Sequence, residues 1–461
     1  MRDKNHASST PTEVIIVGAG LAGLIAARQL AQQGVSVRML EACEHVGGRM
    51  FDYQSTVGHT FQLGAEWLGP DEERLHALLA EFGLETTPHG QAGDAIIQLE
   101  GEVTRFDINQ SVLVGPLPLP PAYRSDDLVL AFEQLNTLCE EVPLDHPEKA
   151  AKAAEWDAIS LAEWSQQHLA TKREQALFSL ITEIEMGVPL DQLSFLYHLF
   201  IWRSINRQMI DDRRVKGGVQ QICDLLAAPL ATRLHLGAAV RSITQDEKGV
   251  VIQSDAGSFS ADYVIVTAPP KPALDITYQP ALPEERTDLL SSLTLSQIMK
   301  CIIVYETPFW VEAGLSGLMM SDEGILKVVD DCSPVDGPPG ALMGLSRSST
   351  TGNWRQYSQQ ERRTAVLAQL TEFFGPQAAQ PLEYIDQDWV SFPWAGGAYL
   401  PNMPPGVMTT SGKVLREPVG RIHWAGTETA TLWTGSMEGA IRSGERAAAE
   451  VLTRLQRGTK M

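Results

Sequence analysis

The first apolar segments of the chain are short and are separated by glycine. Val14–Val17 is apolar throughout, which is typical of a buried strand. The apolar positions of Leu24–Gln32 have the period of a helix, and Gly34 marks the end of that helix. Val35–Leu40 predicts a second strand. This order of strand, helix and strand is typical of the opening unit of a parallel sheet.

Further along the chain, helical and strand patterns occur in blocks. Asp71–Phe82 predicts a helix that Gly83 closes, and Ile96–Phe106 alternates like a hairpin with Gly101 at its turn. Asp126–Gln208 is predicted to be mainly helical, because its apolar positions recur at helical spacing. Later strands are predicted at Leu234–Val240, Val250–Ser254, Tyr263–Ala268 and Met299–Tyr305, and Arg421–Leu452 predicts strand, loop and helix.

Composition and charge narrow the class of protein. The chain has 461 residues with 44% hydrophobic and 20% charged residues, which is ordinary for a globular protein of two or three domains. Its net charge of −21 argues against a nucleic-acid partner. The five cysteines have no metal-ligand spacing and predict free thiols in a reducing, cytoplasmic compartment. No secretory signal, membrane anchor or metal site is expected, and a homodimer is compatible with the sequence.

The glycines after the first strand carry the clearest chemical signal. Gly18, Gly20 and Gly23 form G-x-G-x-x-G at the start of the predicted helix. In this motif the glycines permit a tight turn and a close approach of the backbone to a pyrophosphate. The helix N-terminus offers N–H groups to the phosphates, and Glu41 after the second strand can accept hydrogen bonds from a ribose. The alternative, a glycine-rich turn without a ligand, does not account for the acid.

The cofactor is narrowed by Gly47-Gly48-Arg49, which follows Glu41 within one loop. The two glycines would let the arginine fold back onto the same pyrophosphate and pair with it bidentately. The alternative is a surface loop with a solvated arginine. The arrangement resembles the FAD-binding flavoproteins of the amine oxidase superfamily, so Gly48 and Arg49 are expected to contact FAD.

Three further stretches, Val215–Leu226, Gln297–Trp310 and Trp389–Leu452, make the resemblance specific. The chain resembles the flavin-containing monoamine oxidases of the soluble bacterial kind. The resemblance implies an α/β plus α+β fold, in which a Rossmann-like FAD-binding domain carries an inserted substrate-binding domain of mixed sheet and helices. The FAD-binding domain would comprise residues 1–88, 214–288 and 392–461, and the substrate-binding domain residues 89–213 and 289–391. The further FAD contacts implied are Gly64, Ala65, Glu66, Trp67, Val240, Trp389, Trp394, Gly426, Thr427, Glu428, Ser436 and Met437.

Lys300 has two interpretations. It shares a face of its predicted strand with Ile302 and Val304, and a lysine at such a position often protects an edge strand from pairing. In the resembling family, the matching lysine holds a water against the reactive flavin nitrogen. The resemblance therefore predicts a catalytic role for Lys300.

The substrate side of the flavin departs from the family in two places. Tyr399 matches a tyrosine of the aromatic cage beside the flavin, and it is a predicted catalytic and substrate-binding residue. Ala398 stands where covalent members have a cysteine, so FAD is expected to be bound non-covalently. Ser436 stands where the family has the second cage tyrosine, and Leu345 aligns with an apolar residue of the substrate cavity.

The resemblance implies an FAD-dependent oxidation of an apolar amine, alicyclic, arylalkyl or alkyl. The products would be an imine, then an aldehyde or ketone plus ammonia, with oxygen reduced to hydrogen peroxide. One alternative is an oxidase of polyamines or L-amino acids, which would need acids or an arginine in the pocket. Arg203, Arg207, Glu183 and Glu185 are the residues considered for those roles. A second alternative is a flavin-binding protein without turnover.

Overall fold

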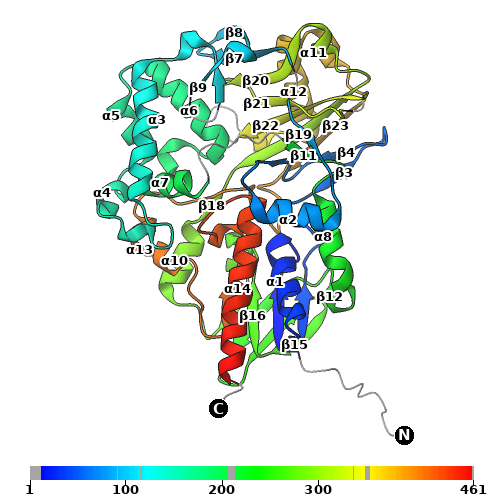
Figure 1. The fold of residues 1–461 in the computed structure, drawn as a ribbon, viewed down its shortest axis with the longest axis vertical. Coiled ribbons are helices and arrows are strands. Elements are labelled where there is room, and N and C mark those ends of the chain that lie inside the picture. Colours follow the sequence, from blue (N-terminus) through cyan, green and yellow to red (C-terminus); the bar gives the residue numbers. More distant parts are fainter. Residues whose placement is uncertain are drawn as a thin grey trace.

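The computed structural model describes residues 12–90, 92–114, 117–205, 213–335, 337–347 and 354–458. A parallel sheet with α1 and α14 lies at the end that carries both termini, and a larger antiparallel sheet with a block of helices lies at the other end (Figure 1). The predicted α/β plus α+β fold is confirmed. The proposed domain boundaries stay a prediction.

The parallel sheet has five strands in the order β12-β2-β1-β16-β25. Its central strands are buried because they are short apolar runs covered on both faces. The strands are β1 (Val14–Val17), β2 (Val37–Leu40), β12 (Leu234–His235), β16 (Tyr263–Val266) and β25 (Ile422–Trp424). Against one face pack α1 (Leu21–Gln32), α8 (Gln220–Ala227) and α14 (Met437–Gly458). A second sheet covers the other face with β13 (Val240–Gln245), β14 (Val250–Ser254), β15 (Gly257–Ala261) and β17 (Thr277–Gln279).

The seven-stranded sheet has the order β23-β19-β22-β21-β20-β7-β8. Its strands are β7 (Asp94–Leu99), β8 (Glu102–Asp107), β19 (Ile298–Tyr305), β20 (Leu315–Ser321), β21 (Val328–Asp331), β22 (Gly340–Arg347) and β23 (Glu383–Asp388). Every residue of β19 is buried, and this strand lies between β22 and β23. The interpretation of Lys300 as an edge lysine is therefore wrong.

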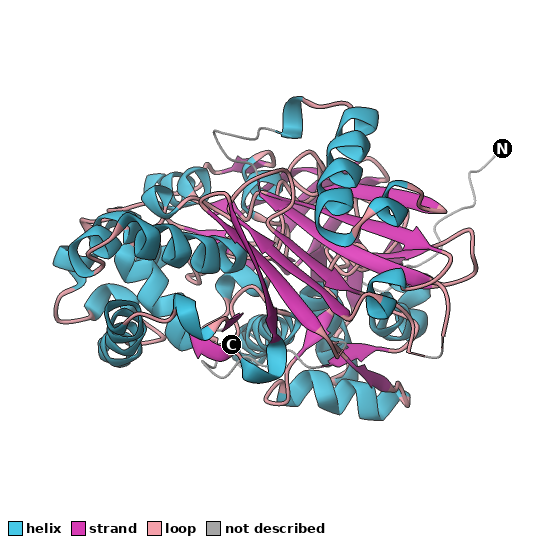
Figure 2. Cartoon of the chain, turned by 90° about the horizontal axis from the view of Figure 1, so that it is seen from above, coloured by secondary structure: helices cyan, strands magenta, loops and turns pink. Residues whose placement is uncertain are grey.

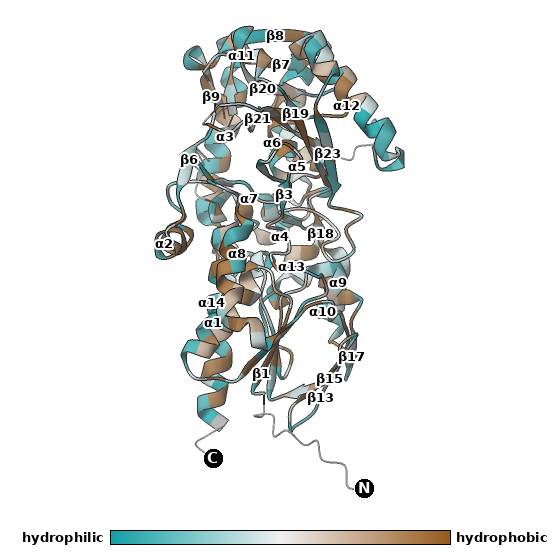
Figure 3. Cartoon of the chain, turned by 90° about the vertical axis from the view of Figure 1, so that its right-hand side faces the viewer, coloured by the Kyte–Doolittle hydropathy of each residue, from teal (hydrophilic) through white to brown (hydrophobic). Residues whose placement is uncertain are grey.

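Two groups of helices cover this sheet. One face packs against α11 (Phe309–Glu312) and α12 (Gln359–Phe374). The other faces a block formed by α3 (Asp126–Leu138), α4 (Ala153–Asp157), α5 (Leu161–His168), α6 (Lys172–Met186) and α7 (Phe195–Ser204). Figure 2 shows this helical block beside the strands. In Figure 3 the buried strand β19 is coloured as apolar, whereas β23 and the outer end of α12 are coloured as polar.

The remaining elements connect these layers. They are β3 (Asp52–Gln54), β4 (Thr60–Gln62), β5 (Trp67–Leu68), α2 (Glu73–Phe82), β6 (Thr86–Pro88), β11 (Arg213–Val215), α9 (Pro270–Leu274), α10 (Glu284–Ser292), β18 (Thr294–Leu295), β24 (Pro401–Asn402) and α13 (Val407–Thr410). None of the helices in the described residues has the length and apolar character of a membrane span. Among the same residues, no group of three or more His, Cys, Asp and Glu side chains could hold a metal ion.

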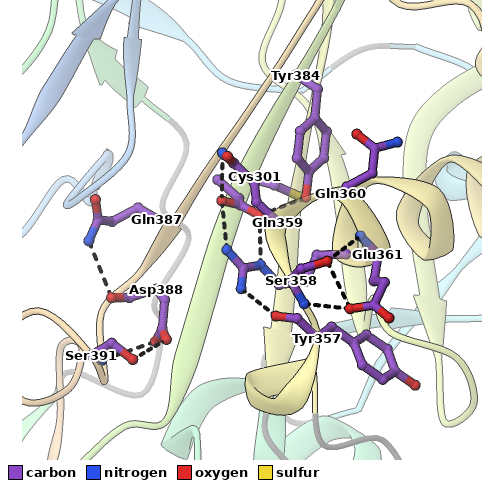
Figure 4. Close-up of polar contacts among 12 residues, drawn as sticks. Cys301, Tyr357, Ser358, Gln359, Gln360, Glu361, Tyr384, Gln387, Asp388 and Ser391 are labelled. Atoms are coloured by element: carbon purple, nitrogen blue, oxygen red, sulfur yellow. Dashed lines mark hydrogen bonds and ion pairs between the residues drawn. The ribbon is translucent and has the colours of Figure 1, made fainter.

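Side-chain hydrogen bonds fix the chain at both ends of β23. Ser358 and Glu361 form a capping box that starts α12 (Figure 4). Arg362, from the first turn of α12, pairs with Asp386 of β23 at 2.8 Å. At the end of the strand, Asp388 accepts hydrogen bonds from the backbone N–H of Val390 and from the Ser391 hydroxyl. This turn directs the chain toward the segment that contains Trp389 and Tyr399.

Local structure differs from the sequence predictions in two places. Leu234–Val240 is not one strand, because Gly237 takes a left-handed φ of 59° and separates β12 from β13. The last helix begins at Met437 rather than Thr434, because Trp433 and Gly435 have φ values of 60° and 89°.

The predicted hairpin at Ile96–Phe106 is confirmed by β7 and β8. Residues 206–208 of the predicted helical block lie outside the described residues.

Candidate active site

The G-x-G-x-x-G turn lies at the carboxyl ends of the parallel strands, where such sheets bind nucleotides. Gly18 has φ 101°, and a Cβ there would lie 2.4 Å from Thr267 Oγ1. A Cβ on Gly23 would lie 2.2 Å from the carbonyl oxygen of Gly18. Gly20 differs, since its φ is −71° and its nearest neighbour to a Cβ would be 3.8 Å away. The first and third glycines are thus needed for packing, whereas the second has room for a Cβ in ordinary contact with Gly47.

The N-terminus of α1 suits an anion. No side chain caps it, and its first turn contains no acidic residue. The first N–H groups of a helix lack partners within the helix, and they carry the positive end of its dipole. A pyrophosphate beside Gly20 would fill this role.

Glu41 is buried at the end of β2, as a ribose-binding acid requires. Its carboxylate accepts hydrogen bonds from the backbone N–H groups of Ala19 at 2.6 Å and Cys43 at 2.8 Å. These bonds fix the side chain and leave lone pairs for further donors. Val240, another predicted contact, begins β13 close to this strand end, where Ala238 N–H donates to the carbonyl oxygen of Glu41 at 2.7 Å.

Arg49 joins three parts of the site that are distant in sequence. Its Nη2 lies 2.5 Å from Glu428 Oε1, and its Nη1 donates to the carbonyl oxygens of Ala398 at 3.0 Å and Tyr399 at 3.3 Å. Thr427, next to Glu428, donates from its hydroxyl to the carbonyl oxygen of Ser436 at 3.0 Å. These contacts bring together the segments Gly48–Arg49, Gly426–Glu428 and Ala398–Tyr399.

Lys300 lies in a buried group of charges. Its Nζ donates to Glu66 Oε2 at 2.6 Å and to the carbonyl oxygen of Gly64 at 3.1 Å, and it lies 5.1 Å from the ring centre of Trp67. Arg214 Nη1 lies 3.3 Å from the other carboxylate oxygen of Glu66. Burial by itself would raise the pKa of Glu66, but the charges of Lys300 and Arg214 outweigh burial and lower it. Glu66 is therefore an ionised partner of Lys300, a role that the sequence did not reveal.

A second, partly buried pair lies next to this group. His89 Nε2 is 2.7 Å from Asp330 Oδ2, and the His89 ring lies edge-on to Trp67 at 5.9 Å. Burial would lower the pKa of His89, but its hydrogen bond to Asp330 raises it. Sequence analysis missed this pair because a single histidine in a loop gives no signal of its distant partner.

The predicted substrate side is mainly apolar. Leu345 is paired with Lys300 across β22 and β19, and Leu345 and Ala398 belong to one hydrophobic cluster. Tyr399 packs against this cluster, and its hydroxyl donates to the carbonyl oxygen of Ile184 at 2.7 Å. Burial raises the pKa of Tyr399, so its phenol stays neutral. Leu345 thus brings this hydrophobic cluster next to Lys300, and Leu345, Ala398 and Tyr399 are called the apolar wall below.

One ion pair interrupts the apolar wall. Glu183, which precedes Ile184, pairs with Arg347 at the end of β22, and both side chains are largely buried. Burial raises the pKa of Glu183, although Arg347 opposes the shift. Arg203 is directed elsewhere, since it donates to the carbonyl oxygen of Glu140 at 3.0 Å. Arg207 lies outside the described residues. Glu183 was a candidate pocket acid from the sequence, whereas Arg347 was not identified there.

The remaining predicted contacts have different surroundings. Trp389 is buried and donates from Nε1 to the carbonyl oxygen of Leu63 at 3.0 Å, beside Gly64 and Ala65. Trp394 lies instead near the guanidinium of the exposed Arg241, at 5.7 Å. Ser436 accepts a hydrogen bond from Gly439 N–H at 3.2 Å, so it caps α14 just before the buried Met437. Its hydroxyl is thereby engaged by the helix rather than left free for a substrate.

A family model described as flavin containing amine oxidoreductase matches residues 21–452. The chain belongs to this family. An L-amino acid dehydrogenase of Synechocystis sp. is 35% identical to it over 97% of this chain and 96% of that protein. The solved structure of cyclohexylamine oxidase from Brevibacterium oxydans is 31% identical, has a TM-score of 0.88, and is matched over 97% of this chain and 100% of that chain. A structure of putrescine oxidase bound to putrescine is 28% identical, with a TM-score of 0.88 and coverage of 96% and 99%.

The protein is therefore a flavin-dependent amine oxidoreductase, and its cofactor is FAD. The residues present fit that cofactor. Gly20 leaves space at an uncapped helix N-terminus, and Glu41 is held at the strand end where a ribose would lie. The individual contacts to FAD remain our proposals.

FAD should dissociate when the protein is denatured, because Ala398 offers no thiol for a covalent bond. The test is to unfold the yellow protein and filter it. We expect all of the flavin in the filtrate. Flavin that stays with the polypeptide would contradict this expectation and would require attachment through another residue.

Proposed function

We propose that this amine oxidoreductase acts on apolar amines, alicyclic, arylalkyl or alkyl, and uses oxygen as the electron acceptor. The products would be an aldehyde or ketone, ammonia and hydrogen peroxide. The observation that carries the proposal is the apolar wall: Leu345 pairs with Lys300 across the sheet and shares one hydrophobic cluster with Ala398, and Tyr399 packs against that cluster. Glu183 and Arg347, which lie next to this wall, pair with each other and neutralise their charges.

An uncharged substrate body suits this wall for an energetic reason. Burying even an uncharged polar group without a partner costs roughly 2–7 kcal/mol, and an unpaired charge costs more. A second ammonium or a carboxylate on the substrate would have to compete with Arg347 or Glu183 for its partner. An amine whose body is a cyclic or linear hydrocarbon buries no further polar group and does not have this cost.

The residues would divide the work as follows. FAD, when bound, takes up the electrons of the amine and passes them to oxygen. Tyr399 would orient the neutral amine with the face of its ring, and its hydroxyl is held by Ile184. Lys300 would hold a water or oxygen beside the reacting atoms and supply positive charge. The retention of Lys300 and Tyr399 argues against a flavin-binding protein without turnover.

A second candidate substrate is an L-amino acid. The 35% identity to an L-amino acid dehydrogenase favours it, and so does Arg347. Within the described residues, Arg347 Nη1 is buried without a hydrogen-bond partner, so it is available to donate to a substrate carboxylate. A diamine is less favoured, although putrescine oxidase is similar in structure, because Glu183 is already paired with Arg347.

A panel of amines read by peroxide release separates these candidates. We expect cyclohexylamine and hexylamine to be oxidised with higher kcat/KM than leucine or putrescine. Each reaction should also be run with a dye as the electron acceptor, so that a dehydrogenase that reacts poorly with oxygen is still detected. If leucine is the best substrate and Arg347→Met removes that activity alone, the amino-acid function replaces the apolar-amine function. A homodimer and a cytoplasmic location also stay predictions.

A further inference from the structure

The Lys300 ammonium donates hydrogen bonds from two of its three N–H groups. The acceptors are Glu66 Oε2 at 2.6 Å and the carbonyl oxygen of Gly64 at 3.1 Å. Because an ammonium is tetrahedral and donates three hydrogen bonds, these two contacts fix the direction of the third. Trp67, whose ring centre is 5.1 Å from Nζ, covers one side of the group. The ammonium is thus oriented by residues of the Gly64–Trp67 segment.

Glu66 also separates two buried cations. Lys300 and Arg214 contact opposite oxygens of its carboxylate, and the side chains of Lys300, Glu66 and Arg214 are 4%, 1% and 9% exposed. Together the three groups carry one net positive charge. Without the carboxylate, two cations would share a buried site, which is costly because neither can be solvated. The charge of Glu66, and not only its shape, therefore keeps Lys300 in place.

We propose that Glu66 is a positioning residue that holds Lys300 as an oriented cation for the reaction with oxygen. Glu66 contacts Lys300 and Arg214, and it acts through Lys300. The role of Lys300 rests on the proposed function. A net positive charge next to the reacting atoms stabilises the negative charge that oxygen acquires as it accepts electrons from reduced FAD.

The test compares four proteins, namely wild type, Glu66→Gln, Lys300→Met and the double variant. Each is reduced with dithionite under anaerobic conditions and then mixed with oxygen, and the return of the yellow colour is timed. We expect Glu66→Gln to slow this reaction by at least about tenfold. The double variant should be no slower than Lys300→Met, because a residue that acts through Lys300 has no further effect once that side chain is absent.

Two further measurements separate positioning from folding. The losses in melting temperature, measured on the four proteins without FAD, should be non-additive, because both single changes break the same contact.

Glu66→Asp keeps the charge and should retain more of the oxygen reaction than Glu66→Gln. Asp331→Asn is the matched control, since Asp331 is a buried carboxylate of β21, in the sheet that contains Lys300, and accepts a hydrogen bond from Trp310 Nε1 at 2.8 Å. It should leave the oxygen reaction unchanged.

Three results would overturn the proposal. The first is a Glu66→Gln variant that reacts with oxygen at the wild-type rate. The second is a double variant whose rate is lowered by the product of the two single effects. The third is a Glu66→Asp variant that reacts with oxygen no faster than Glu66→Gln. Reduction by dithionite needs no amine. A failure to find any amine substrate would therefore contradict the proposed function but leave this test intact.

Discussion

Replacement of Gly20 by valine should leave the protein folded but without FAD. Gly20 has an ordinary φ of −71°, and a Cβ would lie 3.8 Å from its nearest neighbour, so the backbone tolerates a side chain. The added methyl groups would occupy the space where the pyrophosphate approaches the N-terminus of α1. Loss of two hydrogen bonds to a charged phosphate, at about 1.5–3 kcal/mol each, weakens binding by roughly 10²–10⁴-fold.

The measurement is the flavin content and FAD affinity of Gly20→Val, together with the melting temperature of its apoprotein. Gly18→Ala is the matched control, because its φ of 101° and a contact of 2.4 Å to Thr267 make it a packing position. Strain of this kind costs about 1–3 kcal/mol. Gly18→Ala should therefore lower the melting temperature of the apoprotein, and Gly20→Val should not. Full flavin content in Gly20→Val would mean that the pyrophosphate lies elsewhere.

The second large effect is expected from Lys300→Met. The variant should keep its yellow colour, but its reduced form should react with oxygen about 10²–10³-fold more slowly, as when one preorganised electrostatic group is removed from an active site. It should also be less stable, because breaking a buried ion pair costs about 3–5 kcal/mol. Arg214 remains beside Glu66 at 3.3 Å and should reduce this cost.

Lys327→Met provides the comparison for Lys300→Met. Lys327 is partly buried next to β21 of the same sheet and donates to the carbonyl oxygen of Asp322 at 2.5 Å. Lys327→Met removes a lysine next to this sheet but leaves the charges around Glu66 unchanged. The rate of the oxygen reaction should therefore change little. Equal rates in wild type and Lys300→Met would return Lys300 to a purely structural role.

Local patterns were enough to predict the nucleotide-binding unit. The run Val14–Val17, the spacing of Gly18, Gly20 and Gly23, and the acid Glu41 depend on neighbouring residues, so periodicity and turn chemistry determine them. Arg49, Glu428 and Tyr399 lie near one another, as the hydrogen bonds of Arg49 show, whereas the resemblance predicted only that each lies at the cofactor or the substrate. The helix start at Met437 was missed because positive φ values are not visible in a periodic pattern.

The buried charges could not be predicted from local pattern. Lys300 and Glu66 are 234 residues apart, and Glu66 and Arg214 are 148 residues apart. Their partnership depends on how β5, β11 and β19 meet, which no short segment specifies. The same holds for Glu183 with Arg347 and for His89 with Asp330. An ionisable residue within an apolar strand, as Lys300 is, signals only that some partner exists.

The anaerobic reaction with an amine tests the central claim most directly. We expect cyclohexylamine, added to the yellow protein without oxygen, to bleach the flavin absorption. Admission of oxygen should then restore the colour and release hydrogen peroxide in proportion to the amine consumed. A flavin that keeps its colour with every amine of the panel, but is bleached by dithionite, would contradict the account.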